Sequence, residues 1–202
     1  MLLLNNLEFK RSEKTIFENI SFSANSGKII LLKGSNGSGK TTLIKTIINI
    51  LEPTNGEVFW MGEKIKKNIF NFYKNTTFIM DKTTSAANLT IMENISFWKN
   101  LSLSKIKKDE VIRLLNILEL TKYQNTKVMY LSMGEIKKLE LTRLIIEKKK
   151  LWILDEPYNN LDSSSIEIIS QTFADHADKK GIILLASHYE PNIKDLEIFN
   201  LN

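Results

Sequence analysis

The feature that most constrains the fold of this chain is a glycine-rich loop set between a strand pattern and a helix pattern. Residues 28–33, KIILLK, form a short continuous apolar run typical of a strand buried on both faces. GSNGSGKTT follows at 34–42, and apolar residues at helical spacing continue through TTLIKTIINIL at 41–51. The loop matches G-x-x-x-x-G-K-S/T in the strand, loop and helix order that this motif requires. It therefore predicts inward-facing N–H groups and a helix N-terminus that together bind a chain of phosphates.

Two side chains of this loop are expected to add to the backbone. Lys40 would reach the β- and γ-phosphates, and the Thr41 hydroxyl would bind Mg²⁺, which bridges the same phosphates. The residues predicted to bind nucleotide in this loop are Gly34, Ser35, Asn36, Gly37, Ser38, Gly39, Lys40, Thr41 and Thr42. Four fixed positions occur by chance in about one unrelated chain in a hundred of this length. A chance match that is also flanked by a strand pattern and a helix pattern is rarer still.

The rest of the chain alternates buried strands with helices. Further continuous apolar runs predict strands at 76–80, 151–154 and 181–186. Helical patterns extend over 90–100, 109–120, 132–149 and 163–179. Capping boxes open two of these helices, Thr90 with Glu93 and Ser132 with Glu135.

This alternation indicates the fold class. Buried strands separated by helices predict an α/β fold with a mainly parallel sheet core. The alternating segments 2–10 and 16–24 are typical of half-buried antiparallel strands, which predicts a β side sheet. We expect one domain over residues 1–202, with an α-helical subdomain at about 89–149.

Composition excludes several kinds of site and partner. Hydrophobic residues make up 43% and charged residues 25%, as in ordinary globular proteins. The absence of cysteine excludes a disulfide scaffold, cysteine-ligated zinc and thiol catalysis. The net charge of +5 comes from lysines scattered along the chain, so no nucleic-acid partner is expected. MLLLNNLEFK lacks the basic region of a secretion signal, and no apolar run is long enough to span a membrane.

A second chemical element follows the strand predicted at 151–154. LWILDEPYNNLD places Asp155 and Glu156 at the carboxyl end of that strand. In a parallel sheet this end lies beside the phosphate loop, so Asp155 is expected to hold Mg²⁺. Glu156 is expected to polarise the attacking water as a general base. Two carboxylates after a strand, taken alone, more often belong to a solvated loop. Together with a phosphate-binding loop in the same chain, they favour a catalytic site.

Two weaker elements complete the set. LSMGE at 131–135 puts Ser132 at a helix N-cap, with Gly134 permitting close backbone approach, and predicts a second anion-binding terminus. An ordinary capping box has the same pattern. His188 follows the strand predicted at 181–186, at the edge of the sheet that faces a ligand crevice, although a lone histidine is more often structural.

These four elements, in this order along the chain, resemble the ATP-binding subunits of ABC transporters. LSMGE is similar to that family's signature sequence, LWILDE to its Walker B strand with the catalytic glutamate, NNLD to its D-loop and His188 to its switch histidine. The resemblance covers essentially the whole chain. It implies a P-loop ATPase of ABC type that uses ATP and Mg²⁺, with Lys40, Glu156 and His188 as catalytic residues. It also implies a head-to-tail dimer in which Ser132 and Gly134 complete the site on the second ATP-binding subunit.

One subfamily is more similar still, the ATP-binding subunit of the haem exporter of bacterial cytochrome c maturation. The similarity lies in FENISFSANSGKIILLKGSNGSGKTTL, GEVFWMG, LTIMENISFW, LWILDEPYNNLD and GIILLASHYEP. It implies a peripheral protein on the cytoplasmic face of the bacterial inner membrane that powers integral-membrane transporter subunits and acts on a haem chaperone indirectly. The alternatives are another ABC transporter, a soluble ABC-type ATPase acting on ribosomes or nucleic acid, and a nucleotide-binding module without hydrolysis.

Two departures from the family pattern are informative. Arg11, with Phe9 and Phe17 nearby, stands near the place of the aromatic residue that stacks on adenine. Lys82 stands where the family has the glutamine of its Q-loop, counting back from LTIMEN. Because lysine has three donors and no acceptor, we expect Asp81 to supply the missing oxygen and Lys82 to turn toward phosphate or solvent. The alternative is that this loop has drifted and neither residue matters.

Overall fold

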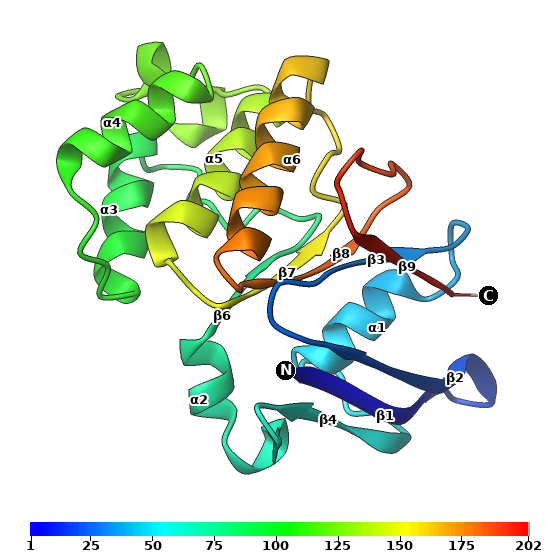
Figure 1. Cartoon of the computed structure of the whole chain (residues 1–202). Coiled ribbons are helices and arrows are strands. Elements are labelled where there is room, and N and C mark those ends of the chain that lie inside the picture. Colours follow the sequence, from blue (N-terminus) through cyan, green and yellow to red (C-terminus); the bar gives the residue numbers. More distant parts are fainter. Residues whose placement is uncertain (202) are drawn as a thin grey trace.

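The computed structural model describes residues 1–201 and contains two sheets with helices between and around them (Figure 1). A parallel sheet runs in the order β6 (Thr76–Ile79), β7 (Leu151–Asp155), β8 (Ile182–Ala186), β3 (Ile29–Lys33) and β9 (Leu196–Asn200). An antiparallel sheet runs in the order β2 (Lys14–Ala24), β1 (Leu2–Arg11), β4 (Asn55–Trp60) and β5 (Glu63–Lys64). The predicted fold class, a mainly parallel core with an antiparallel side sheet, is confirmed.

Apolar residues on both faces explain why β7 and β8 lie at the centre of the parallel sheet. Every residue of these two strands is buried. Neighbouring residues of a strand point to opposite faces, so Leu151 and Ile153 pack in one core while Trp152 and Leu154 pack in the other. A parallel sheet covered on both sides requires this continuous burial.

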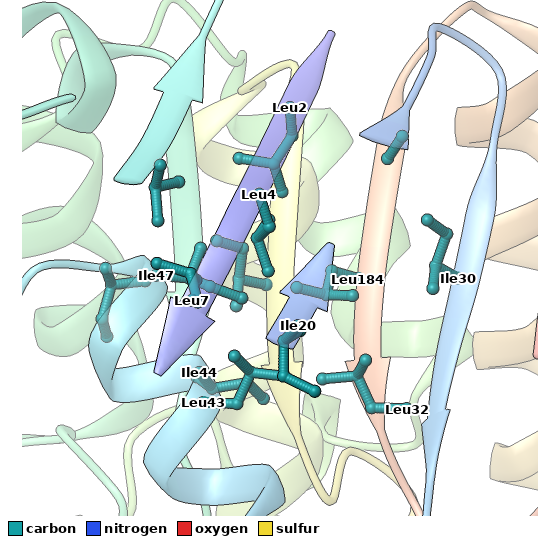
Figure 2. Close-up of a cluster of buried hydrophobic side chains, with 14 of the residues drawn as sticks. Leu2, Leu4, Leu7, Ile20, Ile30, Leu32, Leu43, Ile44, Ile47 and Leu184 are labelled. Atoms are coloured by element: carbon teal, nitrogen blue, oxygen red, sulfur yellow. The ribbon is translucent and has the colours of Figure 1, made fainter. Parts of the chain in front are cut away.

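The first core fills the space between the two sheets and contains the helix that follows the glycine-rich loop. This helix, α1 (Lys40–Ile47), crosses between the parallel and antiparallel sheets (Figure 1). Figure 2 shows its apolar side chains packed with those of β1, namely Leu43, Ile44 and Ile47 with Leu2, Leu4 and Leu7. Burial of each such side chain stabilises the fold by roughly 1.5–3 kcal/mol. The helix is therefore held firmly between the two sheets.

The second core lies on the opposite face of the parallel sheet, under α3 (Ile91–Leu101), α4 (Lys108–Ile117), α5 (Met133–Glu147) and α6 (Ser163–Asp178) (Figure 1). Both predicted capping boxes are confirmed, at Thr90 and at Ser132. Helices α3 to α5 fall within 89–149, and the division of this segment as a subdomain stays a prediction. Within residues 1–201, each helix is too short or too polar to cross a bilayer.

Some boundaries differ from the sequence prediction. The helix predicted through 51 ends at Ile47, and the one predicted through 120 ends at Ile117. Asn49 and Glu119 take positive φ angles of 57° and 59°, a left-handed conformation that stops a helix. The sequence prediction missed the elements β4, β5, β9 and α2 (Ile69–Lys74), together with the 3-10 turns Ile65–Lys67, Thr121–Tyr123 and Val128–Tyr130.

Candidate nucleotide-binding site

The glycine-rich loop holds a buried ammonium group at its centre. Lys40 begins α1, is 7% exposed and donates from Nζ to the carbonyl oxygens of Gly34 at 2.8 Å and Ser35 at 3.1 Å. Gly39 precedes it with φ of 98°, and a Cβ there would lie 2.9 Å from Cγ2 of Ile16. A residue with a side chain would therefore be strained and crowded at Gly39. The loop wraps around the Lys40 head group.

A cavity of about 600 Å³ opens beside this loop. It brings together residues that are far apart in the sequence: Arg11, Ile16, Asn36, Gly37, Gly39, Lys40, Thr41, Thr42, Asp81, Glu156, Asn159 and His188. Such a volume is typical of a small-ligand site. The predicted loop residues, the strand-end glutamate and the histidine thus meet at one cavity. Gly34, Ser35 and Ser38 belong to the loop but do not line the cavity.

Asp155, the last residue of β7, is a buried carboxylate without a hydrogen-bonding partner. It is 1% exposed, and neither of its oxygens has a hydrogen bond within residues 1–201. Burial raises the pKa of this carboxyl, and the nearby Thr41 hydroxyl opposes the rise in part. An unpaired buried carboxylate is costly. The location next to Thr41 suits a bound cation.

Glu156 and His188 lie side by side in the lining of the cavity. Nε2 of His188 is 3.4 Å from Oε1 of Glu156, and the His188 backbone N–H donates to Oε2 at 3.4 Å. The Glu156 N–H donates to the carbonyl of Ala186 at the end of β8, at 2.8 Å. Glu156 has φ of 48°, a left-handed conformation that is uncommon for a residue with a side chain. Glu156 lines the cavity, whereas the buried Asp155 does not.

Ser132 and Gly134 lie apart from this cavity, at the N-terminus of α5. Ser132 Oγ accepts from the Glu135 N–H at 3.3 Å, and Glu135 in return accepts from the Ser132 N–H at 2.8 Å. A Cβ on Gly134 would lie 2.7 Å from the carbonyl oxygen of Asn160, so this glycine permits α5 to approach the loop after β7. Neither residue lines the cavity of its own chain.

The structure also settles where the two unusual positions lie. Asp81 and Lys82 are both exposed, but only Asp81 lines the cavity, where it accepts from Nδ2 of Asn159 at 3.5 Å. Arg11 lines the cavity too, while Phe9 and Phe17 are buried in the core between the sheets. Ile16 and Asn159 also line the cavity: Asn159 begins the NNLD segment that resembles the D-loop, whereas Ile16 belongs to no motif that the sequence analysis singled out.

The arrangement fits ATP with a divalent cation. The loop offers N–H groups and one buried ammonium, the requirement for a chain of phosphates. Asp155 and Thr41 supply hard oxygen atoms, which Mg²⁺ prefers, and leave its other positions to phosphate and water. The unpartnered oxygens of Asp155 are the observation that a cation would explain.

Comparison with known proteins agrees with this geometry. A model of the ABC transporter family matches residues 17–159. The cytochrome c biogenesis ATP-binding export protein CcmA of Reclinomonas americana is 36% identical over 204 residues, covering 100% of this chain and 90% of that protein. The protein of the same name from Haemophilus influenzae is 33% identical over 200 residues, covering 99% of this chain and 94% of its own.

The solved structures show the same fold. An ABC transporter ATP-binding protein from Pyrococcus furiosus has a TM-score of 0.85 at 25% identity, covering 99% of this chain and 96% of that one. Family match, curated relatives and fold therefore agree along nearly the full length of the chain. The chain belongs to the ABC transporter family, among the ATP-binding subunits of the cytochrome c biogenesis type.

Proposed function

We propose that this chain is the ATP-binding and hydrolysing subunit of a transporter for cytochrome c biogenesis, where it energises haem export or the release of a haem chaperone. The observation that carries the proposal is the cavity that joins the Lys40 loop to the Glu156–His188 pair, with the unpartnered carboxylate of Asp155 near Thr41 of the cavity lining. The relatives named for cytochrome c biogenesis support the transport process.

Nucleotide binding would rest on the loop before α1. Lys40 is held at 2.8 Å from the Gly34 carbonyl, so its ammonium stays at the centre of the loop and would exchange this bond for phosphate oxygens. The loop N–H groups and the start of α1 would bind the remaining phosphate charge. Arg11 lines the cavity and has a planar guanidinium that can stack on the base.

Hydrolysis would use the residues at the carboxyl ends of β7 and β8. When bound, Mg²⁺ would supply charge neutralisation on the phosphates, held by Thr41 and Asp155. Glu156 would accept the proton of the attacking water, and His188, 3.4 Å from its carboxylate, would orient it and contact the transferred phosphate. Lys40 would stabilise the charge that develops on the transferred group.

The site would be completed by a second copy of the chain. Ser132 and Gly134 lie outside the cavity of their own chain, at a helix N-terminus suited to an anion. In a head-to-tail dimer each would contact the nucleotide held by the partner's loop. Bound ATP would then act as the contact between the two chains, so dimerisation would require ATP.

We place the working protein at the cytoplasmic face of the bacterial inner membrane, bound to integral-membrane subunits. The test is complementation of a bacterium that lacks its own ATP-binding subunit for cytochrome c biogenesis. The wild-type chain should restore holocytochrome c and co-purify in detergent with multispanning subunits, while Lys40→Ala should co-purify without restoring holocytochrome c. Restoration by Lys40→Ala, or co-purification with ribosomes or nucleic acid instead, would contradict the proposal.

A further inference from the structure

Glu140 of α5 is a buried carboxylate that the nucleotide chemistry does not use. It is 3% exposed, and its Oε1 accepts from the backbone N–H groups of Thr84 at 2.7 Å and Ser85 at 2.6 Å. The hydroxyls of Thr83 and Ser85 donate to the same oxygen at 2.6 Å and 2.7 Å. The 83–85 loop thus forms an anion-binding concavity that is filled by a side chain of α5.

This contact fixes the loop strongly. Burial alone would raise the pKa of Glu140, but hydrogen bonds from Thr83 and Ser85 and the charge of Arg143 hold it below its usual range. The carboxylate is therefore ionised, and hydrogen bonds to an ionised acceptor are roughly twice as strong as neutral ones. Removing the charge would leave two backbone N–H groups with a weaker acceptor or none.

A second buried charged group, Lys137, lies on the same face of α5 as Glu140. Lys137 lies three residues before Glu140, so both side chains are on one side of the helix. Its Nζ is buried and has no hydrogen-bond partner within residues 1–201. Burial lowers the pKa of Lys137, and the charges that most oppose this drop are Asp81 first and then Glu140.

The charged face of α5, made of Lys137, Glu140, Arg143 and Glu147, continues toward β6. Arg143 donates from Nη1 to the Thr84 hydroxyl at 3.1 Å and from Nε to Glu147 at 2.8 Å. Glu147 in turn accepts from the Thr77 hydroxyl of β6 at 2.7 Å. Glu147 thus contacts β6 itself, whereas Glu140 and Arg143 contact the loop that follows Asp81.

We propose that Glu140 is a positioning residue for ATP hydrolysis: it fixes the 83–85 loop on α5 and thereby holds Asp81 at the nucleotide cavity. Asp81 is only two residues before this loop, so the loop sets its place. The inference rests on the proposed function, because it requires Asp81 to act on bound nucleotide.

A double-mutant cycle with purified full-length chain tests the proposal. We expect Glu140→Gln to lower kcat about tenfold and to change the KM for ATP by less than about twofold, since it misplaces a catalytic group without touching the phosphate loop. Asp81→Ala should lower kcat to a similar extent. In the Asp81→Ala background, Glu140→Gln should cause no further loss, because the two residues act through one another.

Two further variants separate positioning from a general loss of structure. Glu147→Gln is the matched control on the same helix face, with its bond to Thr77, and should keep the wild-type kcat. The double variant Thr83→Val with Ser85→Ala removes two hydroxyl donors to Glu140 and should lower kcat as Glu140→Gln does. It keeps the test possible if Glu140→Gln does not fold. Formate added to Glu140→Ala should restore part of the activity by filling the concavity.

The failure of this inference differs from the failure of the proposed function. Wild-type protein without ATP turnover would contradict the function itself. With wild-type turnover present, a silent Asp81→Ala, an unchanged kcat in both the Glu140 and loop variants, or losses that multiply in the double variant would overturn the role of Glu140 alone. An equal loss in Glu147→Gln would also overturn it, since the effect would then be general to the helix face.

Discussion

The two ends of the parallel sheet differ in whether their buried titratable group has a partner within the chain. At the carboxyl end of β7, Asp155 is buried with no hydrogen-bond partner within residues 1–201. At the amino end of the same strand, His176 of α6 lies flat on Trp152, with ring centroids 3.6 Å apart and planes 7° from parallel. Its Nε2 is 3.2 Å from the Lys150 carbonyl, and burial lowers its pKa to about 4.

This difference indicates which end was shaped for a ligand. The imidazole is neutral, stacked and bonded within the chain, so it contributes to folding without any further partner. The carboxylate is left with unused acceptors, a cost that a stable fold does not need to carry. A change at the carboxyl end should therefore affect turnover or binding, whereas a change at the amino end should affect stability alone.

The largest expected effect belongs to the base at the carboxyl end. Glu156→Gln keeps the shape of the side chain but cannot accept a proton, so hydrolysis should fall by about 10²–10⁴-fold while ATP still binds. The variant should then accumulate as an ATP-bound dimer, measured by light scattering with and without ATP. Turnover at the wild-type rate would remove Glu156 from the mechanism.

Loss of ATP binding at the loop is the next effect in size. ATP with Mg²⁺ at 100 times Kd should stabilise the wild-type chain by about 2.7 kcal/mol, which raises the Tm by roughly 5–10 °C for a chain of this size. Lys40→Ala should lose this shift, because the ammonium that the loop carbonyls hold is gone. An equal shift in both proteins, followed by thermal unfolding, would show that the nucleotide binds elsewhere.

Which of these features the sequence could predict depends on how local their signal is. The loop around Lys40, the strand-end pair Asp155–Glu156 and the capping box at Ser132 are each encoded within a few residues, and the structure brings the loop and Glu156 together at one cavity. These positions were recognisable from spacing and residue type alone. Their catalytic and binding roles stay predictions.

The missed features depend on contacts between distant segments. Glu140 is one more polar residue in a helical pattern until the fold brings the 83–85 loop against it. Strand β9 is an exposed edge with no continuous apolar run, and it is held by pairing with β3, over 160 residues earlier in the chain. Ile16 likewise reaches the site only because its strand lies beside the glycine-rich loop. Single-sequence patterns carry no information on such pairings.

At the amino end of the parallel sheet, the buried His176 predicts that the stability of the fold depends on pH. The folded pKa of His176 is about 4 and the ordinary value is 6.5, so the unfolded chain binds more protons between these pH values. Stability should therefore fall as the pH decreases from about 6.5 to about 4. The 2.5-unit difference corresponds to about 3 kcal/mol at most, reduced to about 2 kcal/mol by the partial exposure of the ring.

His176→Phe is the matched variant for this effect. Phenylalanine can still lie on Trp152 but does not titrate, so urea unfolding should show about 2 kcal/mol less destabilisation than the wild type between pH 7 and pH 4. ATP turnover at pH 7.5 should be unchanged, as expected for a residue at the end of the sheet away from the cavity. Parallel pH profiles for the two proteins would contradict the assignment of His176 as a neutral structural group.

The smallest effect expected at the carboxyl end concerns Asp81 and Lys82, where the sequence departs most from the family it resembles. The family's glutamine offers an oxygen at this place, which the Lys82 ammonium cannot, and an ammonium beside a bound cation would be repelled. Asp81 lines the cavity while Lys82 is exposed outside it, so the neighbouring aspartate is placed to supply the oxygen.

Asp81→Ala should accordingly lower the ATPase activity of the assembled complex by about tenfold, or about 1.4 kcal/mol of activation free energy. Lys82→Gln should be tolerated or slightly activating, because it restores an acceptor without removing Asp81. Because the two residues are neighbours, a substitution that merely disturbed the local backbone should lower activity at both positions. A loss at Asp81 alone would therefore be specific to that side chain. A silent Asp81→Ala together with a Lys82→Ala as damaging as Lys40→Ala would reverse the roles and make Lys82 itself a phosphate ligand.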